Sequence, residues 1–289
     1  MEGLGRAQAV READPASPRG HAVITGGSSG IGLALAGRLV ARGWNVTIIA
    51  RDAARLARAR ATLAEQRIDP QQQVIALAAD VADRPAIEAA IEQSLTRLGG
   101  PDLLITSAGI CEPGRVERLP VEVFERTMQV NYLGSLYAAL ACLPAMRSRG
   151  RGRIVLIASG AGLLGVAGYA AYGPPKFALR GLAEILRAEL KPRGIGVTVV
   201  YPGDTETPQL AHERTQRPPE TARIAGLAPA WPVDRMAEII MRGIDKNRAQ
   251  IAPGFQMTML LRFGDLLKPL LFWHFDRMIR KIVAADPPA

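Results

Sequence analysis

The sequence predicts an α/β fold built on one doubly wound parallel sheet. Short apolar runs, of the kind that form buried parallel strands, alternate along the chain with helical stretches rich in Ala, Leu, Arg and Glu. A glycine-rich segment directly follows the first run, and the sequence contains neither a second such segment nor an internal repeat. The expected strands are residues 21–25, 45–50, 74–79, 102–106, 153–157 and 196–201. Together these features indicate a single Rossmann-like domain.

Three segments of different composition divide the 289 residues. Residues 1–19 mix charged residues and proline without an apolar core, which predicts a flexible N-terminal tail rather than a signal peptide or membrane anchor. Residues 20–252 carry the alternating pattern, and residues 253–289 form an apolar and basic C-terminal extension, expected to be helical. With only 2 cysteines, a reducing, cytoplasmic setting is expected.

The glycine-rich segment runs from Gly26 to Gly32, between an expected strand and an expected helix. Gly26 allows a tight turn, Gly30 lets the backbone approach a pyrophosphate, and Gly32 allows close packing of helix on strand. The helix N-terminus then points at the anion, because its free N–H groups and its dipole favour negative charge. This context predicts a dinucleotide site.

A second pattern lies downstream, where Tyr172 and Lys176 stand one helical turn apart and Ser159 ends the apolar run 154–158. We expect the Lys176 ammonium to lower the pKa of the Tyr172 phenol and make it a usable proton donor. The Ser159 hydroxyl can hold a carbonyl oxygen beside that phenol. Residues that follow the strands should gather at one edge of the sheet, where ligands of such folds bind. These residues are Gly26, Asp80, Ser107, Ser159 and Pro202.

The order and spacing of these motifs resemble those of the short-chain dehydrogenase/reductases over about residues 20–252. The matching elements are Thr25-Gly-Gly-Ser-Ser-Gly-Ile-Gly32, Asn131 in Val130-Asn-Tyr-Leu-Gly134, Ser159, Tyr172, Lys176 and Pro202-Gly203. Within the family, segments 124–135, 176–184 and 201–208 resemble the reductases of 3-ketosphinganine. The run Asp204-Thr-Glu-Thr-Pro208 is the most telling of them.

The resemblance implies hydride transfer from a nicotinamide cofactor to a ketone, with Tyr172 supplying the proton and Ser159 orienting the oxygen. Lys176 would hold the nicotinamide ribose and keep Tyr172 acidic, while Asn131 would fix a water in the proton relay. The expected cofactor-binding residues are Gly26, Ser28, Ser29, Gly30, Ile31, Gly32, Arg51, Asp80, Val81, Ala108, Gly109, Tyr172, Lys176, Pro202, Gly203 and Thr205. No metal site is expected.

Arg51 favours NADPH over NADH, because an arginine after the second strand can pair with the 2′-phosphate of the cofactor. Asp52 lies 20 residues after Gly32, where a carboxylate selecting NAD would stand. The strand is expected to end at Ala50, however, which places Arg51 first into the site. The alternative is a solvated Arg51 that pairs with Asp52.

The implied activity is the NADPH-dependent reduction of 3-ketosphinganine, a long-chain amino ketone, to sphinganine in sphingolipid biosynthesis. Residues 202–231 form a long, polar stretch, rich in proline, that we expect to cross the sheet edge as a lid. A protonated amine would suit Asp204 or Glu206, although Asp204 is expected to cap a short helix. Two alternatives stay open: a reductase of another lipid-like ketone, such as a 3-oxoacyl thioester, steroid or retinoid, and a catalytically silent dinucleotide-binding scaffold.

The chain departs from the family pattern at two places. Thr106-Ser107 stands where many relatives carry an asparagine after the fourth strand, which puts the usual bracing of that strand in doubt. Pro174-Pro175 separates Tyr172 from Lys176, and proline fits only the first turn of a helix. Either the helix starts near Gly173 or its start is distorted at Tyr172.

The segment after Gly254 crowds apolar and basic residues together, in a chain whose net charge is +9. It has no uncharged stretch of the roughly 18 residues that a spanning helix needs. We therefore expect peripheral contact with an anionic membrane surface, or else a helix that covers the protein's own pocket or an oligomer interface. Nucleic acid is not an expected partner, because no recognised binding motif accompanies the charge. Homo-oligomers are common in the resembling family.

Overall fold

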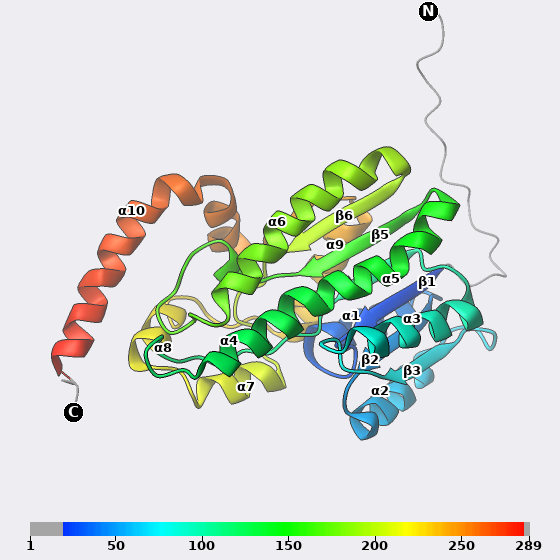
Figure 1. The fold of residues 1–289 in the computed structure, drawn as a ribbon, viewed down its shortest axis with the longest axis horizontal. Helices are drawn as coiled ribbons and strands as arrows, with labels where there is room; N and C mark the ends of the chain where they lie inside the picture. The colour runs from blue at the N-terminus through cyan, green and yellow to red at the C-terminus, as the bar shows by residue number, and fades with distance from the viewer. Residues whose placement is uncertain (1–19, 286–289) are drawn as a thin grey trace, which may run out of the picture.

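A computed structural model describes residues 20–285 of the chain (Figure 1). The expected N-terminal tail, residues 1–19, lies outside the described residues. Seven parallel strands form one sheet in the order β3-β2-β1-β4-β5-β6-β7. They are β1 (His21–Thr25), β2 (Asn45–Ala50), β3 (Val74–Ala78), β4 (Leu103–Thr106), β5 (Gly152–Ile157), β6 (Ile195–Val200) and β7 (Gln250–Ile251). The doubly wound sheet predicted from the sequence is confirmed.

The six predicted strands agree with the structure to within one residue at each end. The prediction missed β7, whose two residues pair with Val199 and Val200 at the edge of the sheet. Its Gln250 is exposed and its Ile251 is buried, so the segment is too short to show an apolar run.

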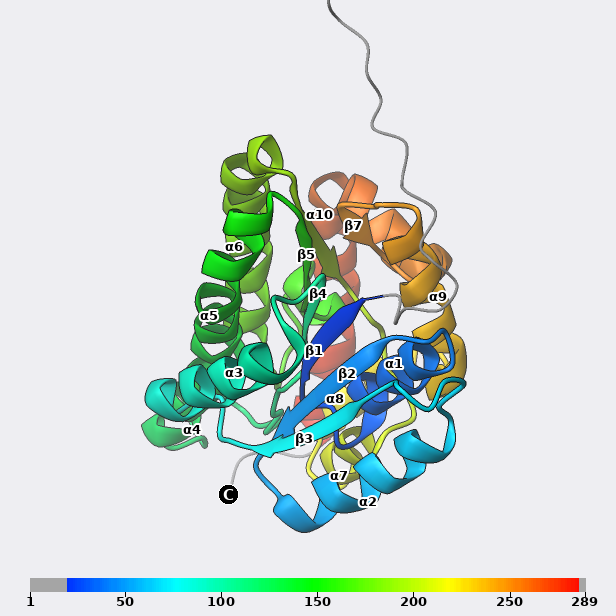
Figure 2. The ribbon, with the colours of Figure 1, turned by 90° about the vertical axis from the view of Figure 1, so that its right-hand side faces the viewer.

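Helices cover both faces of the sheet (Figure 2). One face packs against α1 (Gly30–Val40), α2 (Ala53–Glu65) and α9 (Val233–Asp245). The other packs against α3 (Arg84–Leu98), α5 (Gly134–Arg149) and α6 (Gly173–Leu190), with α4 (Val121–Met128) leading into α5. Each face has its own apolar core, and the central strands β1, β4 and β5 contribute buried side chains to both. This double burial explains why those strands read as unbroken apolar runs.

The carboxyl edge of the sheet is covered by segments from the last third of the chain. They are α7 (Pro208–Arg214), α8 (Pro219–Ala225) and the long α10 (Gly254–Ala285). Helix α10 extends along one end of the molecule and contacts α8 (Figure 1). Among residues 20–285, no helix is both long and apolar enough to cross a bilayer.

Helix α6 begins at Gly173, which decides between the two alternatives raised by the proline pair. Pro174 and Pro175 occupy its first turn, where an N–H group has no partner within the helix. The Gly173 amide donates to the carbonyl of Tyr169 at 2.8 Å. The helix therefore starts without distortion of Tyr172, whose φ of −87° and ψ of −40° are ordinary helical values.

Candidate active site

A cavity of about 940 Å³ lies at the carboxyl edge of the sheet and is lined by α7, α8 and residues 255–275 of α10. Its size falls within the usual range for a ligand site. All the predicted site residues line it except Gly32 and Asn131. The sheet thus brings together residues that follow six of its strands, β1 to β6.

The glycine turn after β1 forms one end of this cavity. Gly26 has a φ of +71°, and a Cβ atom there would lie 2.6 Å from the amide nitrogen of Ala108. A Cβ at Gly32 would lie 2.4 Å from the Gly26 carbonyl oxygen, so Gly32 packs α1 onto the turn as well as onto the sheet. Gly30 also has a positive φ, +54°, and begins α1. Ser29 precedes it without capping the helix through its side chain, so this N-terminus can receive an anion.

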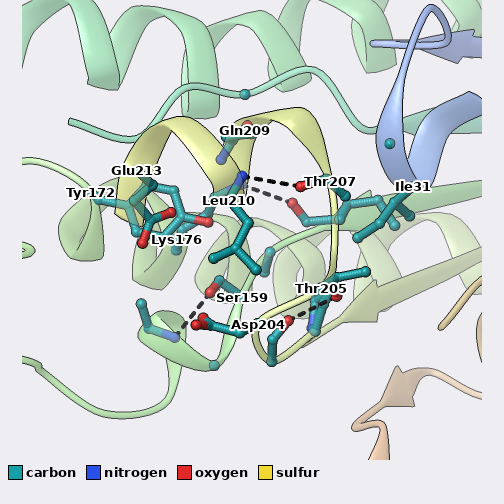
Figure 3. A pocket seen from close by; sticks show the side chains of 18 of the residues that line it. Ile31, Ser159, Tyr172, Lys176, Asp204, Thr205, Thr207, Gln209, Leu210 and Glu213 are labelled. Carbon is teal, nitrogen blue, oxygen red and sulfur yellow. Dashed lines mark hydrogen bonds between the residues drawn. The ribbon is translucent and has the colours of Figure 1, made fainter. Parts of the chain in front are cut away.

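Ser159, Tyr172 and Lys176 meet at the middle of the cavity (Figure 3). Ser159 follows β5 in extended backbone geometry, and its hydroxyl accepts from the amide of Ala161 at 3.2 Å and hydrogen-bonds to the Tyr172 phenol. The ammonium of Lys176 lies 5.5 Å from the centre of the Tyr172 ring and donates to the Ile157 carbonyl at 3.0 Å. The phenol and the Ser159 hydroxyl can therefore both donate a hydrogen bond to the same oxygen of a ligand.

Asn131 lies in a short π-helix, Gln129–Leu133, between α4 and α5. Its amide side chain accepts from the Ile110 amide at 2.8 Å and donates to the Ile110 carbonyl at 2.9 Å. Asn131 thereby fixes the loop after β4, including Gly109, whose added Cβ would lie 3.2 Å from its side-chain oxygen. Such π-turns occur frequently at functional sites.

The same bonds answer the doubt about Thr106-Ser107. Ser107 donates its amide to the Thr25 carbonyl at 3.1 Å, and Asn131 holds Ile110 three residues later. Backbone pairing with β1 and the Asn131 amide thus brace this loop without the asparagine that relatives carry.

Comparisons with known proteins agree with this geometry. Residues 20–218 match the family model described as short chain dehydrogenase. The chain belongs to the short-chain dehydrogenase family. A Danio rerio protein named 3-dehydrosphinganine reductase is 41% identical over 77% of the chain and 67% of its own length. A Dictyostelium discoideum 3-ketodihydrosphingosine reductase is 35% identical over 91% of the chain and 83% of its own.

A solved alcohol dehydrogenase from Thermococcus sibiricus, complexed with 5-hydroxy-NADP, superposes with a TM-score of 0.67. It is 26% identical, and the match covers 78% of this chain and 90% of that one. Membership of the short-chain dehydrogenase family makes the protein an oxidoreductase and implies a nicotinamide dinucleotide cofactor. The glycine turn fits such a group, because side chains at Gly26 and Gly32 would fill the space and α1 leaves its N-terminal amides free.

Burial controls the protonation of the catalytic pair predicted for this short-chain dehydrogenase. Desolvation raises the pKa of Tyr172 well above its usual value, and the hydrogen bond from Ser159 opposes it. Desolvation also lowers the pKa of Lys176 to about 8. The sequence led us to expect that Lys176 would lower the pKa of the phenol; that expectation was wrong for the protein alone, because desolvation of the buried phenol dominates its pKa and the ammonium donates to the Ile157 carbonyl.

Arg51 and Asp52 have different roles in the structure, as their sequence positions suggested. The Asp52 carboxylate caps α2 by accepting from the Arg55 amide at 2.8 Å, so it is engaged in the helix start. Arg51 is exposed at the cavity mouth, and its guanidinium lies 3.7 Å from Asp80 rather than on Asp52. Arg55 lines the same mouth, and sequence reasoning missed it although it follows Arg51 by one helical turn.

The lid carries a buried charged network that the sequence did not reveal. Glu213 accepts from the Tyr169 hydroxyl and from Arg217 at 2.6 Å, and Arg217 also pairs with Asp204 at 2.8 Å. We expected Asp204 to cap a helix, which was wrong: Thr207 caps α7 by accepting from the amide of Leu210. The only sequence signal for the network is the four-residue spacing of Glu213 and Arg217.

The inner side of α10 closes the apolar end of the cavity. Leu260, Leu267, Leu271 and Phe275 line it, and Phe275 packs in a cluster with Leu164 and Ile224. The expectation that the C-terminal extension covers the protein's own pocket is therefore met by one side of the helix. The opposite side remains exposed.

Proposed function

We propose that this short-chain dehydrogenase reduces 3-ketosphinganine to sphinganine with NADPH. The observation that carries the proposal is the continuity of one cavity from the Tyr172 hydroxyl to the apolar inner side of α10. The relatives named for this reaction, 41% and 35% identical, support it. A ketone next to a polar head, followed by a long alkyl chain, matches the order of polar and apolar walls.

In this proposal the Tyr172 phenol donates its proton to the ketone oxygen, and the Ser159 hydroxyl positions that oxygen. The bound reduced nicotinamide supplies the hydride. Lys176 holds the nicotinamide ribose. Its positive charge interacts more strongly with the phenol once a ligand replaces water there, because the local dielectric constant falls. Asn131 acts by fixing the loop after β4 and by orienting a water in the proton relay. The raised pKa keeps Tyr172 protonated, as a proton donor requires.

We propose NADPH rather than NADH because Arg51 and Arg55 both lie at the cavity mouth, beyond β2. Their guanidinium groups can form charge-assisted bonds to a 2′-phosphate. Asp52, the residue that could select NAD, is occupied as a helix cap.

We also propose that the outer side of α10 rests on an anionic membrane surface. Its exposed apolar residues recur at helical spacings of three and four positions and are Phe263, Leu266, Leu270 and Trp273. We call this set the outer stripe. Arg262, Arg277 and Arg280 adjoin it on the same side. An oligomer interface is the alternative occupant of the stripe.

A panel of carbonyl compounds, three ketones and the aldehyde retinal, tests the proposed function. NADPH consumption would be followed with detergent-dispersed 3-ketosphinganine, a 3-oxoacyl thioester, a steroid ketone and a retinal. We expect kcat/KM to be highest for 3-ketosphinganine. A higher value for another carbonyl compound would reassign the substrate, and no turnover of any of them would favour a silent dinucleotide-binding scaffold.

A further inference from the structure

The lid network places an unusual charge in the substrate half of the cavity. Asp204 and Glu213 both line the cavity and share one guanidinium, that of Arg217. Arg214, the next cation on this lid, already pairs with Glu206 at the surface. Two carboxylates facing one guanidinium leave this cluster with a net negative charge.

Only one of these groups is open to a ligand. The side chains of Arg217 and Glu213 are 6% and 8% exposed, whereas that of Asp204 is 27% exposed. Glu213 is also engaged by the Tyr169 hydroxyl and by Arg217 through both Nε and a terminal nitrogen. Asp204 is therefore the carboxylate of the cluster that a bound molecule can reach.

The carboxylates lie close enough to the reaction centre to act on it. Both Glu213 and Asp204 raise the pKa of the Tyr172 phenol through their charge, after the larger effect of burial. Tyr169, which holds Glu213, also packs edge-on against Tyr172 with ring centres 5.6 Å apart. Figure 3 shows Asp204, Glu213 and Tyr172 around one cavity. A cation bonded to Asp204 would thus sit within a short distance of a ketone held by Tyr172 and Ser159.

Another part of the lining favours an apolar group. It consists of Leu164, Ile224, Leu267, Leu271 and Phe275. A ligand that fits both parts carries a cationic group near its carbonyl and an alkyl chain beyond it. In 3-ketosphinganine the protonated amine is on the carbon next to the ketone, and the alkyl chain leaves from the other side of the ketone.

We propose that Asp204 is the subsite for the protonated amine of a 2-amino ketone, with Glu213 and Arg217 as positioning residues that hold its carboxylate. This inference rests on the proposed function, because it takes a long-chain amino ketone as the substrate. The subsite would let the enzyme distinguish this ketone, which carries a positive charge on its amine, from neutral ketones. A charge-assisted bond of this kind contributes about 1.5–3 kcal/mol.

The test compares 3-ketosphinganine with its desamino analogue, in which hydrogen replaces the amine. For the wild-type enzyme we expect kcat/KM to be about 10- to 100-fold higher for the amino ketone, the factor that corresponds to that bond. In Asp204→Asn this ratio should fall toward one. Glu206→Gln, a matched carboxylate on the same loop that pairs with Arg214 at the surface, should keep the wild-type ratio.

The outcomes separate the subsite from the proposed function. If the wild type reduces both ketones equally well, Asp204 does not bind the amine, although the reductase assignment stands. This comparison uses the wild type alone and does not depend on the folding of a variant. An equal loss on both ketones in Asp204→Asn, with the ratio preserved, would show a purely structural role and overturn the proposal. If the wild type reduces neither ketone, the proposed function and the subsite fail together. Glu213→Gln should lower the ratio through KM for the amino ketone, and Glu213→Asp should restore part of it.

Discussion

Lys176 and Tyr172 show how burial changes the pKa of a side chain. Both are removed from water, and the same desolvation raises the pKa of the phenol and lowers that of the ammonium. The pair therefore holds a protonated phenol beside an amine whose charge is easily lost. A hydride donor and a carbonyl brought into this site would meet a proton donor at neutral pH.

Lys176 should leave a measurable trace in stability. Its pKa in the folded protein is about 8, below the ordinary 10.5, so the unfolded chain binds more protons between these values. Burial of the charged ammonium thus destabilises the fold below pH 8, and this penalty fades as the pH rises toward 10.5. We expect Lys176→Met to be more favourable, relative to wild type, at pH 7 than at pH 9.5, by about 2 kcal/mol. Urea unfolding of both proteins at the two pH values measures it; a difference independent of pH would contradict the assigned pKa.

Arg51 should set the choice of cofactor. Loss of one charge-assisted contact to the 2′-phosphate predicts that Arg51→Ala weakens NADPH binding about 10- to 100-fold and leaves NADH binding nearly unchanged. Fluorescence titration with both cofactors gives the two affinities. Arg42→Ala is the matched control, because Arg42 forms a surface ion pair with Asp245. Equal affinities of the wild type for NADPH and NADH would remove the assignment.

At the scale of elements, α7, α8 and α10, all from the last third of the chain, together form the lid over the cavity. Its polar segments pair within the lid through Glu213 with Arg217, and with the segment before α4 through Glu220 and Arg115 at 2.7 Å. Its apolar segments pack on one another, with Phe275 of α10 against Ile224 of α8. The lid thus has a polar part near Tyr172 and an apolar part farther out.

Phe275 should govern the fit of the alkyl chain. It is 7% exposed, and Phe275→Ala would open a cavity where the chain is expected to lie. We expect a higher KM for 3-ketosphinganine and an unchanged KM for a short-chain analogue that cannot reach α10. Phe272→Ala, on the same helix but 42% exposed, should change neither value. The same KM increase for both chain lengths would place the alkyl chain elsewhere.

The elements also show how far the sequence carries. Apolar runs identify β1 to β6, and the glycine turn, Ser159, Tyr172 and Lys176 could be placed because each follows a strand or begins a helix. The lid network could not be predicted, because Asp204, Glu213 and Arg217 look in the sequence like ordinary polar surface residues. Only the fold brings their side chains into contact. For the same reason, the direction of the Tyr172 pKa depends on burial, which local spacing does not report.

At the scale of the whole molecule, a net charge of +9 and the outer stripe of α10 are the two features that favour the proposed membrane contact. Apolar side chains flanked by arginine suit the headgroup region of an anionic bilayer, where a long-chain lipid substrate would be found. Helix α10 also lines the cavity, so the proposed membrane contact would bring the bilayer close to the apolar end of the site.

Leu266→Glu and Leu270→Glu test this contact without disturbing the inner side of the helix. Both positions are exposed, at 80% and 64%, so the fold should tolerate them. We expect the double variant to lose most co-sedimentation with anionic liposomes, because each glutamate would carry a negative charge toward the anionic headgroups. Ile185→Glu, an exposed apolar site on α6, is the control. Unchanged liposome binding, or a wild type that does not bind, would exclude the stripe as a membrane contact; a change of oligomeric state in the variant would favour an interface.

The central claim is tested most directly by following the hydride itself. The wild-type enzyme would be incubated with 3-ketosphinganine and NADPH deuterated at the transferred position of the nicotinamide, and the lipid product analysed by mass spectrometry. We predict sphinganine that carries the deuterium on the carbon of the former ketone, with the rate reduced about 100- to 10,000-fold in Tyr172→Phe. Unlabelled product, no sphinganine from the wild type, or a Tyr172→Phe variant with near wild-type rate would contradict the account.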